Sequence, residues 1–167
     1  MPEINPMPEI GLRPATADDA ESVAAIWATG WRDGHLGHVP EALVAARTPE
    51  SFRTRAAQRV GDTVVAVVGP DRQVVGFVMM VGEEVEQVYV ALSHRGTGVA
   101  GSLLAEAERL VAAGGHRRAW LAVVPGNTRA RRFYRRSGWV DEGLFDYPAV
   151  VEGDTVPVRC HRYVKPL

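Results

Sequence analysis

The strongest chemical signal in the chain is a glycine-rich stretch. It lies between a segment rich in β-branched residues and a segment with helical periodicity, and it consists of Arg95, Gly96, Thr97, Gly98, Val99, Ala100 and Gly101. Glycines let the backbone approach a ligand closely, and the first N–H groups of a helix carry partial positive charge. The stretch therefore predicts an anion site suited to a pyrophosphate, and a helix start without a ligand is the alternative.

Two nucleotide-binding motifs fit this stretch poorly. Gly96, Gly98 and Gly101 have the spacing of the dinucleotide fingerprint, but residues 91–95 separate them from the preceding strand, which the fingerprint turn should follow directly. The next expected strand also ends without the acidic residue that binds the ribose in that motif. A P-loop needs a Gly-Lys pair, and the only lysine of the chain is Lys165.

Two segments resemble motifs of the GCN5-related N-acetyltransferases, the GNAT family. Arg95, Gly98 and Ala100 have the spacing R-x-x-G-x-G/A of motif A, and Val88-Tyr89-Val90 precede them. The second segment is similar to motif B and contains Asn127, Ala130, Phe133, Tyr134, Gly138 and Trp139. Residues 12–19 are similar to the first strand and helix of the family, so the resemblance covers about residues 10–145.

The resemblance implies an α/β (α+β) fold of the GNAT type. Its central sheet is mixed and mostly antiparallel, with about six or seven strands flanked by about four helices. It also implies an N-acetyltransferase that moves an acetyl group from acetyl-CoA directly to a primary amine of a small molecule or peptide. Acetyl-CoA is then a co-substrate, no metal is expected, and the backbone of Gly96–Gly101 holds the coenzyme A pyrophosphate.

The resemblance assigns further coenzyme contacts to the strand before the glycine stretch. Backbone N–H groups near Val90 would polarise the thioester carbonyl, because in the family this strand pulls away from its neighbour and leaves backbone groups unpaired. Val88, Tyr89 and Val90 are therefore candidate coenzyme-binding residues. Asn127 is either a helix cap or a contact to the pantetheine arm, and both roles can hold together.

Candidates for proton transfer are a tyrosine and a group of glutamates. The family uses a tyrosine at the position of Tyr134, which could donate a proton to the leaving thiolate and contact the coenzyme; a core aromatic is the alternative. Glu83, Glu84 and Glu86 lie where the family often carries a glutamate, and side-chain alternation puts Glu84 and Glu86 on one face of the strand. Glu84 fits the general base best, and an exposed strand start is the alternative.

The acceptor side is expected between the first helices and the last strands. Trp31, His35 and Tyr147 are its candidate substrate-binding residues, and His35 could serve as a second base. His35 and His38 have no third metal ligand at a clear spacing. Trp27 is expected in the core, and Cys160 and His161 are expected to be packing or edge residues.

Two other functions remain open at this point. The uncertain base leaves a non-catalytic acyl-CoA-binding or sensor module on the same fold as the main alternative. The arginines between Arg129 and Arg136 could bind nucleic acid, although such a run is usually a solvated helix face. We expect no nucleic-acid partner and no membrane partner, and a homodimer is left open.

The pattern of apolar residues predicts which elements position these groups. A helical stripe runs from Val23 to Trp31 and is broken into a loop by Gly30, Gly34 and Gly37. The other expected helices cover 41–47, 49–60, 99–113 and 128–136, and the expected strands cover 10–13, 63–68, 74–81, 85–90, 119–124, 139–144 and 156–164.

Length and composition describe the whole chain. Its 167 residues fit one acetyltransferase domain, 1–167, with a flexible N-terminus at residues 1–9 and either Met1 or Met7 as the start. The single cysteine favours a reducing, cytoplasmic location. The net charge of −1 conceals a split, since residues 91–138 carry nine arginines and two glutamates, which is +7, and the remainder carries −8. The acidic remainder predicts an acceptor side that suits a cationic amine.

Overall fold

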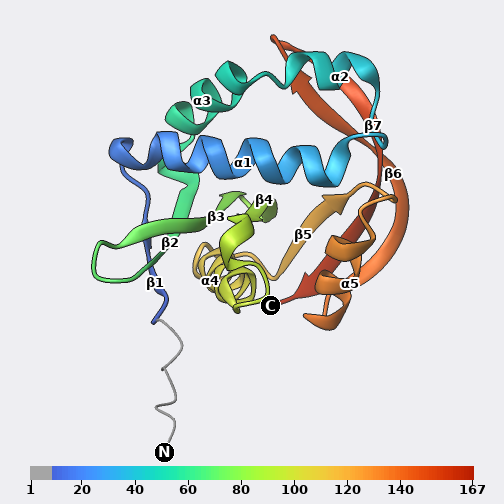
Figure 1. Cartoon of the computed structure of the whole chain (residues 1–167). Helices are drawn as coiled ribbons and strands as arrows, with labels where there is room; N and C mark the ends of the chain where they lie inside the picture. Colours follow the sequence, from blue (N-terminus) through green and yellow to red (C-terminus); the bar gives the residue numbers. More distant parts are fainter. Residues whose placement is uncertain (1–8) are drawn as a thin grey trace, which may run out of the picture.

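A central sheet of seven strands with helices on both of its faces organises the chain (Figure 1). The computed structural model describes residues 9–167. Its strands are β1 (Gly11–Pro14), β2 (Thr63–Val68), β3 (Gln73–Val81), β4 (Glu84–Val90), β5 (Arg118–Val123), β6 (Val140–Val151) and β7 (Asp154–Pro166). Its α-helices are α1 (Ala20–His35), α2 (Glu41–Ala46), α3 (Pro49–Gln58), α4 (Val99–Ala113) and α5 (Thr128–Arg136).

The strand order is β1-β2-β3-β4-β5-β7-β6, and all neighbours are antiparallel except β4 and β5. This confirms the expected mixed, mostly antiparallel sheet. The parallel pair β4–β5 is joined at one register position, Glu84 opposite Trp120. Past that position the two strands diverge, so a gap opens in the middle of the sheet.

Each face of the sheet has its own hydrophobic core. On one face, α4 and α5 contribute Leu103, Leu104 and Tyr134 to a core that also contains Trp139. On the other face, α1 and α3 contribute Trp27 and Phe52 to the second core, and the indole of Trp27 is fully buried, as the sequence predicted. Figure 1 shows α1 lying across this second face, with α3 and α2 above it.

The first helix differs from the prediction, because it does not break at its glycines. Gly30 and Gly34 lie inside α1, which continues to His35. A Cβ on Gly30 would lie 2.3 Å from Cδ1 of Tyr89, and a Cβ on Gly34 would lie 2.7 Å from Nδ2 of Asn127. These glycines therefore allow α1 to approach β4 and the start of α5 closely, rather than ending the helix.

Within residues 9–167 the five α-helices lie at the five segments that sequence patterning indicated. The end of β6 is the prediction that needs correction. Strand β6 continues to Val151 instead of ending at Leu144, and it forms a long hairpin with β7. Gly143, with φ of 107°, lies at the register shift in the β6–β7 hairpin. Because this irregularity interrupts the alternation of side chains, the sequence pattern did not predict the second half of β6.

Other predictions concern the chain ends and membranes. The flexible N-terminus and the choice between Met1 and Met7 concern residues that, apart from Glu9, lie outside the described part of the chain. Among residues 9–167, no helix combines the length and the apolar character that crossing a membrane requires.

Candidate active site

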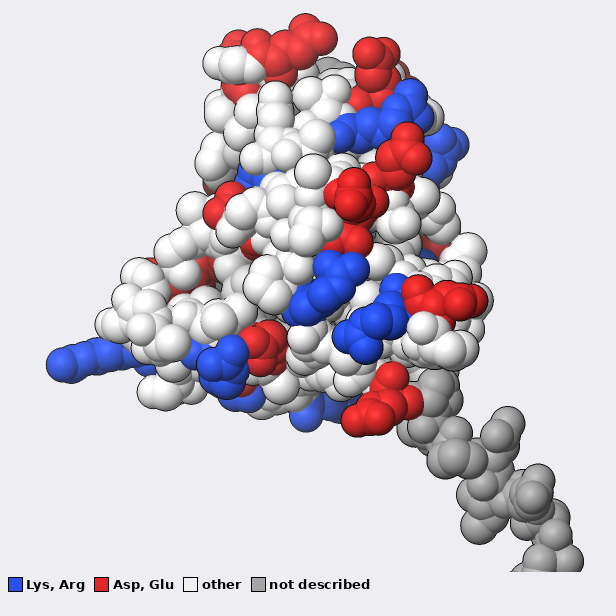
Figure 2. All heavy atoms as spheres, turned by 90° about the vertical axis from the view of Figure 1, so that its left-hand side faces the viewer, with Lys and Arg blue, Asp and Glu red and all other residues white. Residues whose placement is uncertain are grey.

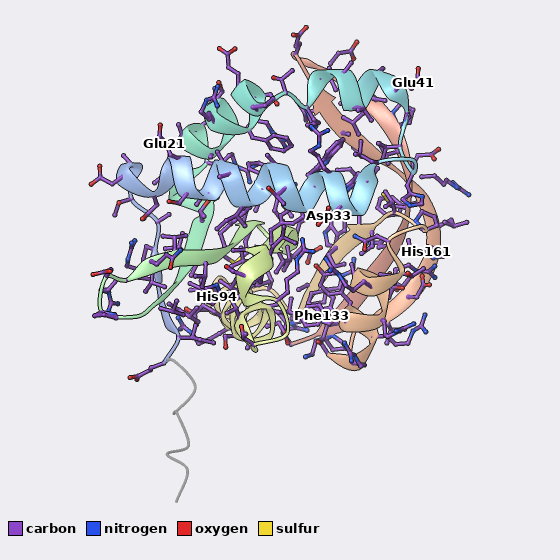
Figure 3. The ribbon with its side chains drawn as sticks, in the orientation of Figure 1. Glu21, Asp33, Glu41, His94, Phe133 and His161 are labelled. Carbon is purple, nitrogen blue, oxygen red and sulfur yellow. The ribbon has the colours of Figure 1, made fainter. Side chains whose placement is uncertain are left out.

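The glycine-rich stretch forms the turn that enters α4. Gly96 and Gly98 have positive φ values of 76° and 89°, a backbone conformation that glycine adopts without strain, and Gly98 is the N-cap of α4. The Thr97 hydroxyl donates a hydrogen bond to the carbonyl of His94. Arg95 donates to Oδ2 of Asp33 at 2.9 Å, which fastens the turn to the underside of α1 (Figure 3).

The backbone of this turn is free to bind an anion. Among the described residues, none accepts a hydrogen bond from the backbone N–H groups of Gly96 to Gly101. A Cβ built on Gly96, Gly98 or Gly101 would meet no atom within 4 Å, so the space before the turn is open. Free N–H groups, a helix N-terminus and open space together fit a pyrophosphate.

The gap between β4 and β5 leaves a second set of backbone groups free. Strand β4 pairs with β3 along its length, but its other edge meets β5 only through Glu84 and the Glu83 carbonyl, which accepts from the Trp120 N–H at 3.0 Å. The edge from Val88 to Val90 therefore has no strand partner. The predicted divergence of this strand is confirmed, and an extended ligand arm could pair with its backbone.

A cavity of about 830 Å³ occupies this gap and reaches both faces of the sheet. Trp31 and His35 line it from α1, and Tyr134 lines it from α5, on the opposite face. Of the other predicted site residues, Glu84, Val88, Tyr89, Asn127 and Tyr147 also line the cavity. Val90, at the end of β4, and residues 95–101, in the turn that enters α4 and its first residues, do not line it.

An irregularity in β4 turns several polar side chains toward the cavity. Met79 pairs with Gln87 and Met80 pairs with Val85, so Glu86 is an extra residue in β4, a β-bulge. Glu84, Glu86 and Gln87 consequently all line the cavity. Glu83 is not among the lining residues, as side-chain alternation predicted, and it lies 3.9 Å from Arg118.

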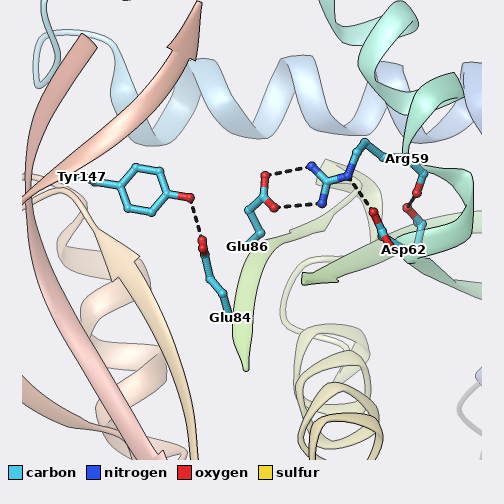
Figure 4. Close-up of polar contacts among 6 residues, drawn as sticks. Arg59, Asp62, Glu84, Glu86 and Tyr147 are labelled. Atoms are coloured by element: carbon cyan, nitrogen blue, oxygen red, sulfur yellow. Dashed lines mark hydrogen bonds and ion pairs between the residues drawn. The ribbon is translucent and has the colours of Figure 1, made fainter. Parts of the chain in front are cut away.

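The two cavity glutamates have different partners (Figure 4). The Tyr147 hydroxyl donates a hydrogen bond to Oε2 of Glu84 at 2.6 Å. Glu86 accepts two hydrogen bonds from Arg59, at 2.9 and 2.8 Å, and Arg59 also binds Asp62. Burial raises the pKa of Glu84 from its ordinary value, while the bond from Tyr147 opposes that shift. Glu84 is therefore the carboxylate better suited to accept a proton, because Glu86 is held by an ion pair.

Tyr134 points into the cavity from a cluster of aromatic rings. Its ring packs against Phe133, Trp139 and Tyr163, with centroids 5.2 to 6.3 Å away. Burial raises the pKa of its phenol, so the group is protonated at neutral pH. The hydroxyl is a potential donor that no described side chain engages.

His35, at the end of α1, and Asn127, at the start of α5, both line the cavity. The His35 ring stacks on Trp31 at 4.8 Å, and Nδ1 lies 2.9 Å from the Trp31 carbonyl oxygen, which assigns the proton to Nδ1. Burial lowers the pKa of His35 to about 4, so the ring is neutral and its Nε2 can accept a proton or a hydrogen bond. Oδ1 of Asn127 accepts from the Ala130 N–H at 3.3 Å, which confirms the capping interpretation.

The sequence analysis missed the arginines of the cavity. Arg47, Arg55 and Arg59 line it from the region of α2 and α3. Arg55 and Arg59 are four residues apart, a spacing that puts them on one helix face. Because α3 has few apolar residues, however, its sequence is typical of an exposed helix, and nothing marks these arginines as cavity residues. Glu50, Glu84, Glu86 and Glu152 line the same cavity, so side chains of both charges meet there and the expected acidic acceptor side stays a prediction.

Cys160 and His161 behave as predicted. Cys160 is buried and borders the cavity, and burial raises the pKa of its thiol to about 11. His161 lies beside Asp141, with Nδ1 3.0 Å from Oδ2. No group of three or more potential metal ligands was found within residues 9–167.

Comparison with known proteins gives a consistent family. The family model described as "Acetyltransferase (GNAT) family" matches residues 23–139. Uncharacterized N-acetyltransferases of Mycobacterium tuberculosis and Mycobacterium bovis are 34% identical over 96 residues, which is 53% of this chain and 62% of theirs. The match thus spans less than two thirds of the length of these curated relatives.

Solved structures share the fold. A GCN5-related N-acetyltransferase from Rhodopseudomonas palustris superposes with a TM-score of 0.71 at 21% identity, covering 96% of this chain and 98% of that one. The PaiA N-acetyltransferase from Thermoplasma acidophilum, solved in complex with coenzyme A, superposes with a TM-score of 0.65 at 18% identity, covering 95% and 99%.

Proposed function

Because the chain belongs to the GNAT family of acetyltransferases, we propose that it transfers an acetyl group from acetyl-CoA directly to a primary amine of a small molecule or peptide. The observation that carries this proposal is the run of free backbone N–H groups from Gly96 to Gly101, next to a gap in the sheet that opens into a cavity. A pyrophosphate at the turn would leave an attached arm free to enter the gap.

The chain's own residues would bind the donor in two places. Acetyl-CoA supplies the acetyl group as a reactive thioester. The N–H groups of Gly96–Gly101 would bind its pyrophosphate, and the free edge of β4 at Val88, Tyr89 and Val90 would align its pantetheine arm. The same edge would direct an N–H group near Val90 at the carbonyl oxygen, where negative charge develops.

Proton transfer would involve groups on both sides of the gap. As the amine nitrogen bonds to the carbonyl carbon and the carbon–sulfur bond breaks, Glu84 would take the amine proton, directly or through a water. Tyr134 would donate its phenolic proton to the thiolate. Direct transfer is supported because the one thiol bordering the cavity, Cys160, has a pKa of about 11 and is a poor nucleophile at neutral pH.

Thiol release from acetyl-CoA with a broad amine library tests the proposal, together with calorimetric binding of coenzyme A. Gly101→Glu should abolish binding, because a carboxylate would enter the anion site at a residue whose φ is not positive and whose substitution is therefore unstrained. Ala112→Glu, exposed near the other end of α4, is the matched control. Binding of coenzyme A without turnover of any amine would favour the sensor function instead.

A cytoplasmic location and a homodimer remain predictions. Sedimentation analysis of the full chain would test the homodimer.

A further inference from the structure

The cavity contains two arginines without a carboxylate partner. Within residues 9–167, Arg59 is the cavity arginine that forms ion pairs, whereas no Asp or Glu lies within ion-pair distance of Arg47 or Arg55. Arg47 donates one hydrogen bond, from Nη2 to the Val150 carbonyl at 2.8 Å. Arg55 stacks over the Trp27 ring at 4.3 Å, and its Nη1 is buried with no hydrogen-bond acceptor. Burying an unpaired charge is costly, so this arrangement calls for an anion.

The carboxylates of the cavity are already engaged or lie elsewhere. Glu86 is bound by Arg59, and Glu84 accepts from Tyr147. Glu50 and Glu152 line the cavity from exposed positions at its rim. The charge of Glu86 acts on Arg55 from a distance, but no described carboxylate forms an ion pair with Arg47 or Arg55.

A phenol completes this corner of the cavity. The positive charges of Arg55 and Arg47 both act on the buried phenol of Tyr89, which burial keeps protonated, so the hydroxyl can donate to an anion as well. Tyr89 comes from β4, Arg55 from α3 and Arg47 from the C-terminal end of α2. All three side chains line the same cavity as Glu84. Guanidinium groups bind carboxylates through two parallel hydrogen bonds, which gives orientation as well as affinity.

From this arrangement we infer that the acceptor is an amine that also carries a carboxylate, as an amino acid does, and that Arg55 and Arg47 bind this carboxylate. The inference rests on the proposed function and deepens it by naming the substrate class. The bound carboxylate would fill the place of the missing counter-ion, while the amine end of the acceptor would remain free to face Glu84.

The test compares amino acids with their amides. Each proteinogenic amino acid and its C-terminal amide would be offered with acetyl-CoA, and thiol release would be measured. The amides lose a proton from the amine more readily, so chemistry alone favours them. A preference for the acids, expected to be about tenfold to a hundredfold in kcat/KM, would therefore reflect recognition of the carboxylate.

Three variants locate that recognition. Arg55→Gln should raise KM for the preferred acid about tenfold or more and lower the ratio of kcat/KM for the acid to kcat/KM for its amide by a similar factor. Arg47→Gln should act in the same direction, and it keeps the test open if Arg55→Gln does not fold. Arg53→Gln, exposed on the same helix and outside the cavity, should leave the ratio of acid to amide unchanged.

The outcomes separate this inference from the proposed function. Turnover of amides or simple amines with no preference for acids, or an unchanged ratio in both Arg55→Gln and Arg47→Gln, overturns the inference and leaves the function standing. Calorimetry of the coenzyme A-loaded protein with N-acetyl amino acids gives a second readout. Binding that depends on Arg55, in a chain that acetylates no amine, would support the carboxylate site and overturn the proposed function.

Discussion

At the scale of single residues, the contact between Tyr147 and Glu84 determines how the candidate base titrates. The two residues are 63 positions apart in the sequence, and the hydroxyl donates to the carboxylate at 2.6 Å. Burial raises the pKa of Glu84, whereas the hydrogen bond favours the ionised form and lowers it. The tyrosine therefore keeps the base ionised to a lower pH than burial alone would allow.

Replacing Tyr147 by phenylalanine should shift the pH dependence of activity. Loss of the hydrogen bond raises the pKa of Glu84 further, and a base must be deprotonated to act, so the acid limb of the kcat/KM profile should move to higher pH. Tyr163→Phe is a control, because the Tyr163 hydroxyl accepts from Arg131 and does not contact Glu84. An acid limb that stays in place or moves to lower pH would exclude Glu84 as the titrating base.

Replacing Tyr134 by phenylalanine should reduce kcat and leave the affinity for coenzyme A nearly unchanged. The substitution removes the one proton that the phenol can donate to the thiolate, and assistance by a general acid contributes about 10²–10⁴-fold. Stopped-flow or steady-state thiol release gives kcat, and calorimetry gives the affinity. If the variant turns over at the rate of the unaltered chain, Tyr134 has no part in the mechanism.

Sequence patterns located some of these residues and missed others for a physical reason. Glu84 and Tyr134 stand within short segments that carry their own local signal, and both line the cavity. Arg55 lies on α3, which has few apolar residues, and Arg47 directly follows the short α2, so nothing local distinguishes either arginine from a solvated side chain. Their burial depends on α1 and on the β6–β7 hairpin, which are distant in sequence.

At the scale of secondary-structure elements, the glycines of α1 determine how closely that helix packs on the sheet. Sequence patterning treated Gly30 and Gly34 as helix breakers, because glycine has low helix propensity. The contact that favours glycine at position 30 is the close approach of Tyr89. Tyr89 lies in a strand almost sixty residues later, so a pattern confined to α1 cannot predict the contact. Strands with continuous apolar runs, such as β2, were predicted with their observed bounds because they are buried along their whole length.

Gly30→Ala should destabilise the protein although alanine is the better helix former. The new methyl group would lie 2.3 Å from Cδ1 of Tyr89, and overpacking of this kind costs about 1–3 kcal/mol, against a gain in helix propensity of at most about 1 kcal/mol. Gly101→Ala, in open space at the start of α4, should be neutral or slightly stabilising. Urea denaturation of both variants measures the difference; an equal or higher free energy of unfolding for Gly30→Ala would contradict the close packing.

At the scale of the whole molecule, the distribution of charge differs from what a count along the chain suggests. Figure 2 shows acidic and basic side chains intermixed on the face seen from the left of Figure 1. The division into a segment of +7 and a remainder of −8 is a property of the sequence, and it does not divide the interior of the cavity in the same way. Folding brings Arg47, Arg55 and Arg59, all from the acidic remainder, to the cavity wall.

Coenzyme A should protect two distant segments from hydrogen exchange at once. Within the described chain, the amides of residues 96–101 have no acceptor, and the edge of β4 at residues 88–90 that faces β5 has no strand partner, so a bound pyrophosphate and pantetheine arm would give both segments acceptors. The turn between β2 and β3, at residues 69–72, is the internal control and should exchange at the same rate with and without the ligand. Protection of neither segment at saturating coenzyme A would show that the ligand binds elsewhere.

The divergence of β4 from β5 also has a consequence for how specificity could change over evolution. The turn proposed to bind the donor lies in the β4–α4 connection. The cavity arginines Arg47, Arg55 and Arg59 come from residues 41–59, and the sheet lies between the two segments. Substitutions in that short segment could therefore replace one amine substrate with another while the donor machinery stays intact. Because the donor and the acceptor reach the opening in the sheet from different segments of the chain, the residues that bind each of them could change independently during evolution.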